Sequence, residues 1–120
     1  MYDHIGLKVN DLDASVRFYE AALAELGYKL CSQDRSGASF GRHGEPALWL
    51  YPANGSGAST MHLALRAPNR AAVDGFHSSG IARGGRDNGQ PGLRPDYSPG
   101  YYAAFLHDPD GNNVEAVCMT

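Results

Sequence analysis

The sequence predicts an α+β fold in which one supersecondary unit, a strand followed by a helix and more strands, occurs twice. The first observation is an internal repeat. The segment His-Ile-Gly-Leu-Lys-Val that begins at His4 is echoed by His-Leu-Ala-Leu-Arg-Ala at His62, an offset of 62 − 4 = 58 residues, and Phe18 recurs as Phe76 at the same offset. The second is that each half opens with strand-like alternation and continues with helical spacing. A repeat that occurs only twice predicts a duplicated module rather than a solenoid, with the two histidines facing a shared interface.

The first half is typical of a strand, a helix and three short strands. Residues 4–9 alternate between apolar and polar side chains, as a half-buried strand does. Asp11 is placed to cap the helix that follows and Gly27 to end it. The apolar positions of that helix keep a spacing of three or four: Leu12, Val16, Tyr19, Leu23 and Leu26. Turn residues then separate the expected strands, which are residues 28–33, 38–42 and 47–51.

The second half repeats this order after a linker. Residues 53–60 are rich in Gly and Ser and lie where the repeat predicts that the two halves join. A strand is expected over residues 61–67, and Asn69 is placed to cap a second helix. Ser78-Ser79-Gly80 weakens the later turns of this helix, so we expect it to be shorter than the first or frayed.

The rest of the second half predicts a loop and two strands. Residues 87–100 contain three Pro and three Gly and are expected to form a long loop over the site. Strands are expected at 101–107 and 113–119, joined by the turn Asp108-Pro109-Asp110-Gly111. We therefore expect a single domain over residues 1–120, made of two βαβββ modules at about 1–52 and 61–120.

Composition excludes several classes of partner. The chain has 120 residues, 42% of them hydrophobic, and a net charge of −3 without a basic cluster, so nucleic acid is not expected as a partner. No apolar run approaches the ~20 residues of a membrane span, and the first residues do not form a signal peptide. Cys31 and Cys118 show no CxxC spacing. They are expected to be reduced structural residues, which predicts a cytoplasmic location.

Three residues could carry metal chemistry. His4 and His62 lie on the polar faces of the two opening strands, and Glu115 lies on the face of the last strand opposite Val114 and Ala116. A carboxylate in an apolar strand is costly to bury unless it is paired or bound to a metal. Two imidazoles and a carboxylate make a set that suits one divalent ion (Fe, Mn, Zn, Ni or Co) and leaves positions open for substrate. A single histidine or glutamate in a strand is more often structural, so the prediction depends on the matched placement of the two histidines.

Both ends of the chain resemble the vicinal oxygen chelate superfamily, which includes glyoxalase I, bleomycin- and fosfomycin-resistance proteins and extradiol dioxygenases. The resemblance is carried by Asp3-His4-Ile5-Gly6-Leu7, by Ser15-Val16-Arg17-Phe18-Tyr19, and by the closing segment from Phe105 to Glu115, which contains Asp108-Pro109-Asp110-Gly111. It implies paired βαβββ modules that form an open, barrel-like cup, with His4, His62 and Glu115 at the ligand positions. It also implies a homodimer, and whether the cup forms within one chain or across two chains is open at this point.

One departure from the family bears on the reaction. Glyoxalase I has a fourth ligand, a glutamate on the last strand of the first module, whereas residues 47–51 here offer no carboxylate and Glu45 lies in the preceding turn. A three-ligand set resembles the dioxygenases and the fosfomycin-type transferases more than lactoylglutathione lyase. We expect an enzyme acting on a small molecule with vicinal oxygens, by dioxygenation, by isomerase or lyase chemistry, or by nucleophile transfer. The alternative is a metal-free module that sequesters a drug or metabolite.

Four further side chains are candidates for contact with the substrate. One of Tyr101 and Tyr102 should face the cup, because neighbours in a strand alternate. That tyrosine could donate a hydrogen bond to an oxyanion, although a packed tyrosine with a solvated hydroxyl is also consistent with the pattern. Arg94 could hold an anionic substrate or be a solvated loop residue. Trp49 belongs to the core or, second, to the cup wall. The remaining histidines are expected at the surface: His43, His77 and His107.

Overall fold

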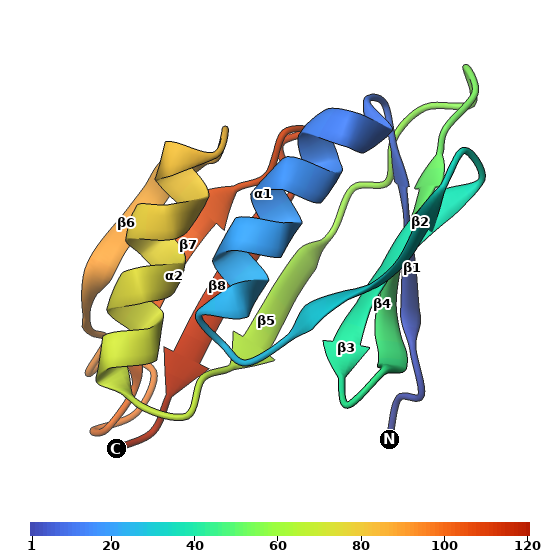
Figure 1. The fold of residues 1–120 in the computed structure, drawn as a ribbon. Helices are drawn as coiled ribbons and strands as arrows, with labels where there is room; N and C mark the ends of the chain where they lie inside the picture. Colours follow the sequence, from blue (N-terminus) through green and yellow to red (C-terminus); the bar gives the residue numbers. More distant parts are fainter.

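The computed structural model describes residues 1–120 and contains two successive βαβββ modules (Figure 1). The first module consists of β1 (Ile5–Val9), α1 (Leu12–Ala24), β2 (Lys29–Asp34), β3 (Gly37–Arg42) and β4 (Glu45–Pro52). The second consists of β5 (His62–Arg66), α2 (Arg70–Ala82), β6 (Arg86–Leu93), β7 (Tyr102–His107) and β8 (Asn113–Cys118). The duplicated α+β fold predicted from the repeat is confirmed.

Each module forms its own mixed four-stranded sheet, and the two sheets have the same topology. The strand orders are β1-β4-β3-β2 and β5-β8-β7-β6. In each sheet the first strand pairs in parallel with the last strand of its module, and the other pairs are antiparallel. The opening strand of each module is therefore a sheet edge.

The helices begin where the sequence predicted and are equally long. The Asp11 side chain accepts a hydrogen bond from the Ala14 N–H at 3.1 Å, and Asn69 accepts one from Ala72 at 2.8 Å. The expectation that α2 is shorter was wrong, because both helices span 13 residues. Gly80 allows close packing there: a Cβ on it would lie 2.4 Å from Leu106 Cδ1. Tertiary packing thus outweighs the low helix propensity of the Ser-Ser-Gly segment.

Residues 86–93 form an edge strand and not the loop expected from residue 87 onward. β6 pairs with β7, with register shifts between Asp87 and Gly89 and between Gly89 and Gly92. Bulges and proline are tolerated at the edge of a sheet, because the outer backbone groups there need no partner strand. The Pro- and Gly-rich composition therefore marks an irregular edge strand, and only residues 94–101 connect it to β7.

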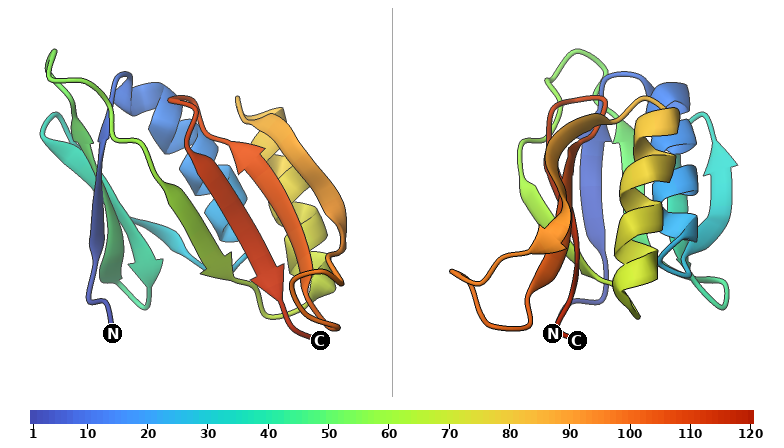
Figure 2. Two further views of the ribbon diagram at one scale, coloured as in Figure 1. Left: turned by 180° about the vertical axis from the view of Figure 1, so that it is seen from behind. Right: turned by 90° about the vertical axis from the view of Figure 1, so that its left-hand side faces the viewer.

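The helices cover one face of each sheet and leave the other face open. Figures 1 and 2 show α1 between the two sheets and α2 over the second sheet, with the two helices side by side. The core is continuous between the modules and includes Phe18, Leu50, Phe76 and Leu106. The polar residues that alternate with these apolar residues point to the open faces, which is where the candidate site lies.

Two polar contacts made by buried side chains connect separate elements. The Tyr19 hydroxyl of α1 donates to Asp108 Oδ2 at 2.6 Å, and burial followed by the Asp108 carboxylate raises the pKa of Tyr19 well above its usual value. His77, expected at the surface, is buried on α2 with its Nε2 atom 2.8 Å from Asp87 Oδ1. His77 is buried, contrary to that expectation, because β6 covers its face of α2.

Two other expectations concern the cysteines and the membrane. Cys31 and Cys118 are both free, as predicted. Neither helix is long and apolar enough to cross a membrane.

Candidate functional site

The candidate site on the second sheet is built around a buried glutamate. Glu115 of β8 lies opposite Ala64 of β5, and its side chain is 3% exposed. Its Oε2 atom is 3.0 Å from His62 Nε2. A buried carboxylate needs a hydrogen-bond partner or a cation, and the imidazole supplies that partner from the adjacent strand.

The His62 ring is oriented by a second contact. Its Nδ1 atom lies 3.2 Å from the carbonyl oxygen of Asn113, and its Nε2 atom faces Glu115. A backbone carbonyl at Nδ1 is the arrangement that commonly fixes a metal-binding histidine with Nε2 available. The ring also stacks on Phe105 with centroids 6.5 Å apart, and half of the side chain is exposed.

Tyr101 completes the contacts of the carboxylate. Its hydroxyl donates to Glu115 Oε1, the oxygen that His62 does not contact. Burial, and next Glu115, raise the pKa of Tyr101 to about 12, so the phenol stays protonated at neutral pH. Tyr102 points to the opposite sheet face, where its hydroxyl donates to Asp74 Oδ1 of α2 at 2.6 Å. Of the two candidate tyrosines, only Tyr101 belongs to the site.

Two further side chains lie on the same sheet face. Phe105 of β7 is the register partner of Glu115, and the guanidinium carbon of Arg94 lies 5.4 Å from the centroid of its ring. Arg94 is half-buried rather than solvated. Phe105 was missed by the sequence analysis, although alternation from Tyr101 along β7 would have placed it on this face.

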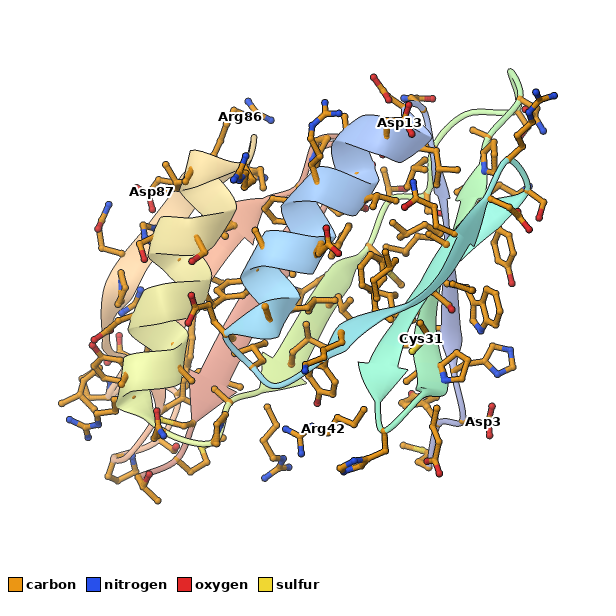
Figure 3. All side chains as sticks on the ribbon, viewed as in Figure 1. Asp3, Asp13, Cys31, Arg42, Arg86 and Asp87 are labelled. Carbon is orange, nitrogen blue, oxygen red and sulfur yellow. The ribbon has the colours of Figure 1, made fainter.

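His4 is not part of this group of side chains. It precedes β1 on the first sheet, where its Nδ1 atom contacts Asp3 Oδ1 at 2.6 Å and 55% of its side chain is exposed. Figure 3 shows Asp3 on the opposite side of the molecule from Arg86 and Asp87 of β6. Within one chain, no group of three His, Cys, Asp or Glu side chains is placed to hold a metal ion. The predicted three-residue metal site therefore stays a prediction, with two of its members in contact.

Trp49 occupies the position in the first module that Glu115 occupies in the second. Gly6 pairs with Trp49 and Ala64 pairs with Glu115, and the repeat offset relates Gly6 to Ala64. Trp49 stacks on Tyr51 with centroids 6.1 Å and ring planes 3° apart, and it lies outside the hydrophobic core. The first preference of the sequence analysis, a core tryptophan, was wrong, because the core side of β4 is filled by Leu48 and Leu50.

An apolar groove of about 600 Å³ lies between the modules. Its lining includes Leu23, Tyr28, Phe40, Leu48 and Leu63, and Asp3 and His4 also contribute to it. The volume is within the range of small-molecule sites in proteins.

Comparison with known proteins gives one consistent family. The model of the Glyoxalase/Bleomycin resistance protein/Dioxygenase superfamily matches residues 2–116. The uncharacterized protein YqjT of Bacillus subtilis (strain 168) is 35% identical, and the match covers 95% of each chain. A glyoxalase/bleomycin resistance protein from Albidiferax ferrireducens T118 has a similar structure, with a TM-score of 0.81 and 33% identity over 98% of this chain and 97% of the other. A glyoxalase I variant from Zea mays gives a TM-score of 0.71 and 28% identity over 95% of this chain and 44% of the other.

Proposed function

The chain belongs to the glyoxalase/bleomycin resistance protein/dioxygenase superfamily, and from this premise we propose that it is a divalent-metal-dependent enzyme acting on a small molecule with vicinal oxygens. We propose that two copies build the site, with His62 and Glu115 from one chain and His4 from its partner. The observation that carries the proposal is the buried Glu115 carboxylate, which presents one oxygen to His62 Nε2 at 3.0 Å.

The residues of this chain fit a metal ion by their donor chemistry. In both histidines the Nδ1 atom contacts an oxygen: the Asn113 carbonyl for His62 and the Asp3 carboxylate for His4. The Nε2 atom of each ring is therefore the nitrogen that would bind a metal ion. Tyr101 occupies Oε1 of Glu115, so Oε2 is the oxygen available for an ion. Two imidazoles and one carboxylate suit Fe, Mn, Zn, Ni or Co and leave open positions for substrate.

The roles of the protein groups follow from these contacts. When bound, the ion would supply Lewis-acid stabilisation of charge on a substrate oxygen. Tyr101 holds its proton at neutral pH and keeps the Glu115 carboxylate in one orientation, and Phe105 supports the His62 ring. Trp49 stands where a second carboxylate would lie. Glu45, expected in the preceding turn, is instead the exposed first residue of β4 and pairs with Arg42, and the Asp3 carboxylate is in contact with Nδ1 of His4. This favours dioxygenase or transferase chemistry over the proton transfers of glyoxalase I.

A homodimer is required by this proposal, since one chain does not gather the three side chains. Both β1 and β5 are sheet edges, and Ser59 of the linker bonds the outer backbone groups of β1 only at Lys8. Dimerisation that brings the open face of the first sheet against the partner's second sheet would unite His4 with His62 and Glu115. Closed two-fold assembly then forms two equal sites per dimer.

The second candidate function is metal-free sequestration of a small molecule. The apolar groove between the modules favours it, because apolar lining and a volume of about 600 Å³ suit a drug-sized ligand. In that case Glu115 needs no metal, since His62 and Tyr101 already satisfy its two oxygens.

A complementation experiment tests both the metal site and its sharing between chains. His4→Ala and Glu115→Gln each remove one ligand, so neither variant alone should bind Mn(II) or Zn(II) at the site. When the two are mixed and allowed to exchange subunits, each mixed dimer regains one intact site, so roughly a quarter of the wild-type metal content should return. Equilibrium dialysis with metal analysis measures it. If wild type binds metal but the mixed variants regain none, the site lies within one chain. If wild type binds no metal, the result favours sequestration.

A further inference from the structure

We infer that Arg94 makes this site selective for substrates that carry an anionic group, a carboxylate or a phosphonate, at the end remote from the metal ligands. The inference deepens the proposed function and rests on it, because it assigns the substrate class of the same site. It depends on three observations: how the guanidinium is held, its lack of a charge partner, and its place relative to Glu115 and His62.

The guanidinium lies in a cradle that the irregular edge strand β6 provides. One of its terminal nitrogens donates to the carbonyl oxygen of Gln90 at 2.6 Å. A Cβ on Gly89 would lie 3.3 Å from one terminal nitrogen, and a Cβ on Gly92 would lie 3.2 Å from the other. Both glycines therefore leave room for the group, and Phe105 lies under it at 5.4 Å. A half-buried arginine held from several sides loses little further freedom when a ligand binds.

The charge of this guanidinium is not balanced by the protein. Every ion pair in the structure joins a histidine to a carboxylate, and none involves Arg94. The nearby Glu115 is already engaged by His62 and Tyr101. Arginine carries several N–H donors in a planar fork, and the bond to Gln90 uses only part of that capacity. The remaining donors are available to a ligand.

The position of Arg94 fits a bridging substrate. Phe105 lies between the arginine and the metal ligands: its ring is 5.4 Å from the guanidinium carbon and 6.5 Å from the His62 ring, and it is the register partner of Glu115. A small molecule can therefore place its oxygens near Glu115 and an anionic group at Arg94, with its carbon skeleton against Phe105.

The arrangement of N–H donors on the Arg94 guanidinium determines which anions it binds well. Carboxylate and phosphonate oxygens match the parallel N–H groups of a guanidinium and form charge-assisted, bidentate hydrogen bonds. A polyanion such as nucleic acid is not favoured, because the chain has a net charge of −3.

The test measures anion binding without metal, so that it is independent of the metal site. Chelator-treated protein is titrated with phosphonoacetate and with its uncharged triethyl ester by isothermal calorimetry. The variants are Arg94→Gln, Arg94→Lys and the matched control Arg86→Gln, which removes an exposed arginine from the first position of β6, the strand that precedes Arg94. Thermal unfolding of each variant verifies that it is folded.

We expect wild type and Arg86→Gln to bind phosphonoacetate with equal affinity and to bind the ester at least about tenfold more weakly. Arg94→Gln should lose at least about tenfold in affinity for phosphonoacetate, and Arg94→Lys should lose less, because lysine keeps the charge without the fork. The inference is overturned if wild type does not bind phosphonoacetate, or if Arg94→Gln binds it like wild type. An equal loss in Arg86→Gln overturns it too, since the effect would then be one of net charge. Metal binding that fails while anion binding succeeds would reject the proposed function alone.

Discussion

Replacing Tyr101 with Phe should weaken both the fold and the metal site, because this hydroxyl is one of two groups that satisfy the buried Glu115 carboxylate. A hydrogen bond to a charged group contributes about 1.5–3 kcal/mol to stability. Tyr101 is only half-buried, so solvent can partly replace the hydroxyl and the lower figure applies. A loss of about 1.5 kcal/mol in a domain of this size lowers the melting temperature by roughly 6 °C.

The same substitution should lower metal affinity, since Tyr101 orients a ligand without binding the ion itself. Partners of this kind typically contribute about 10- to 100-fold to metal affinity. The assay combines urea unfolding, followed by circular dichroism, with a titration of Zn(II) or Mn(II) into the metal-free protein.

Tyr102→Phe is the matched control for this prediction. It removes the same hydroxyl from the neighbouring residue, but on the opposite sheet face, where the partner Asp74 is exposed. Its stability loss should stay below about 1 kcal/mol, and its metal affinity should be unchanged. Equal losses of stability and metal affinity in the two variants would refute the positioning role of Tyr101.

Two other variants test the buried carboxylate and the contact between modules. Glu115→Gln should fold with nearly wild-type stability when metal-free, because an amide can accept a hydrogen bond from His62 and donate one to the Tyr101 oxygen. Its metal affinity should fall by more than about 100-fold. Urea unfolding and metal titration measure the two effects, and an unchanged metal affinity would contradict the prediction. Tyr19 has its pKa raised in the folded state, so its contribution to stability is fully present below the unfolded pKa of about 10 and is lost as pH rises above it. Urea unfolding between pH 8 and pH 11 (roughly two units below and one above that pKa) should therefore show a steeper loss for wild type than for Tyr19→Phe, and parallel curves would count against this linkage.

The combined results would separate the candidate functions. Loss of metal binding in Tyr101→Phe and Glu115→Gln, together with recovery in mixed dimers, supports a shared metalloenzyme site. Sequestration in the apolar groove is supported if wild type binds no metal and the variants still bind the small molecule.

The sequence by itself determined the elements and the sheet faces of the main candidates. Alternation in strands and spacing in helices are local properties, so the two modules, the caps at Asp11 and Asn69, and the shared face of His62 and Glu115 could be predicted. The repeat also predicted that the two modules have the same topology.

Only the tertiary structure decided features that depend on contacts between distant residues. The register of β7 against β8 brings Tyr101 and Phe105, rather than Tyr102, beside Glu115. A Pro- and Gly-rich segment became an edge strand because β7 pairs with it, and α2 kept its full length because Gly80 packs against Leu106. The separation of His4 from Glu115 within one chain follows from the packing of α1 against α2, which sets the orientation of the two sheets. No local pattern encodes that orientation, because it results from side-chain packing between helices whose nearest ends, Ala24 and Arg70, are 46 positions apart in the sequence.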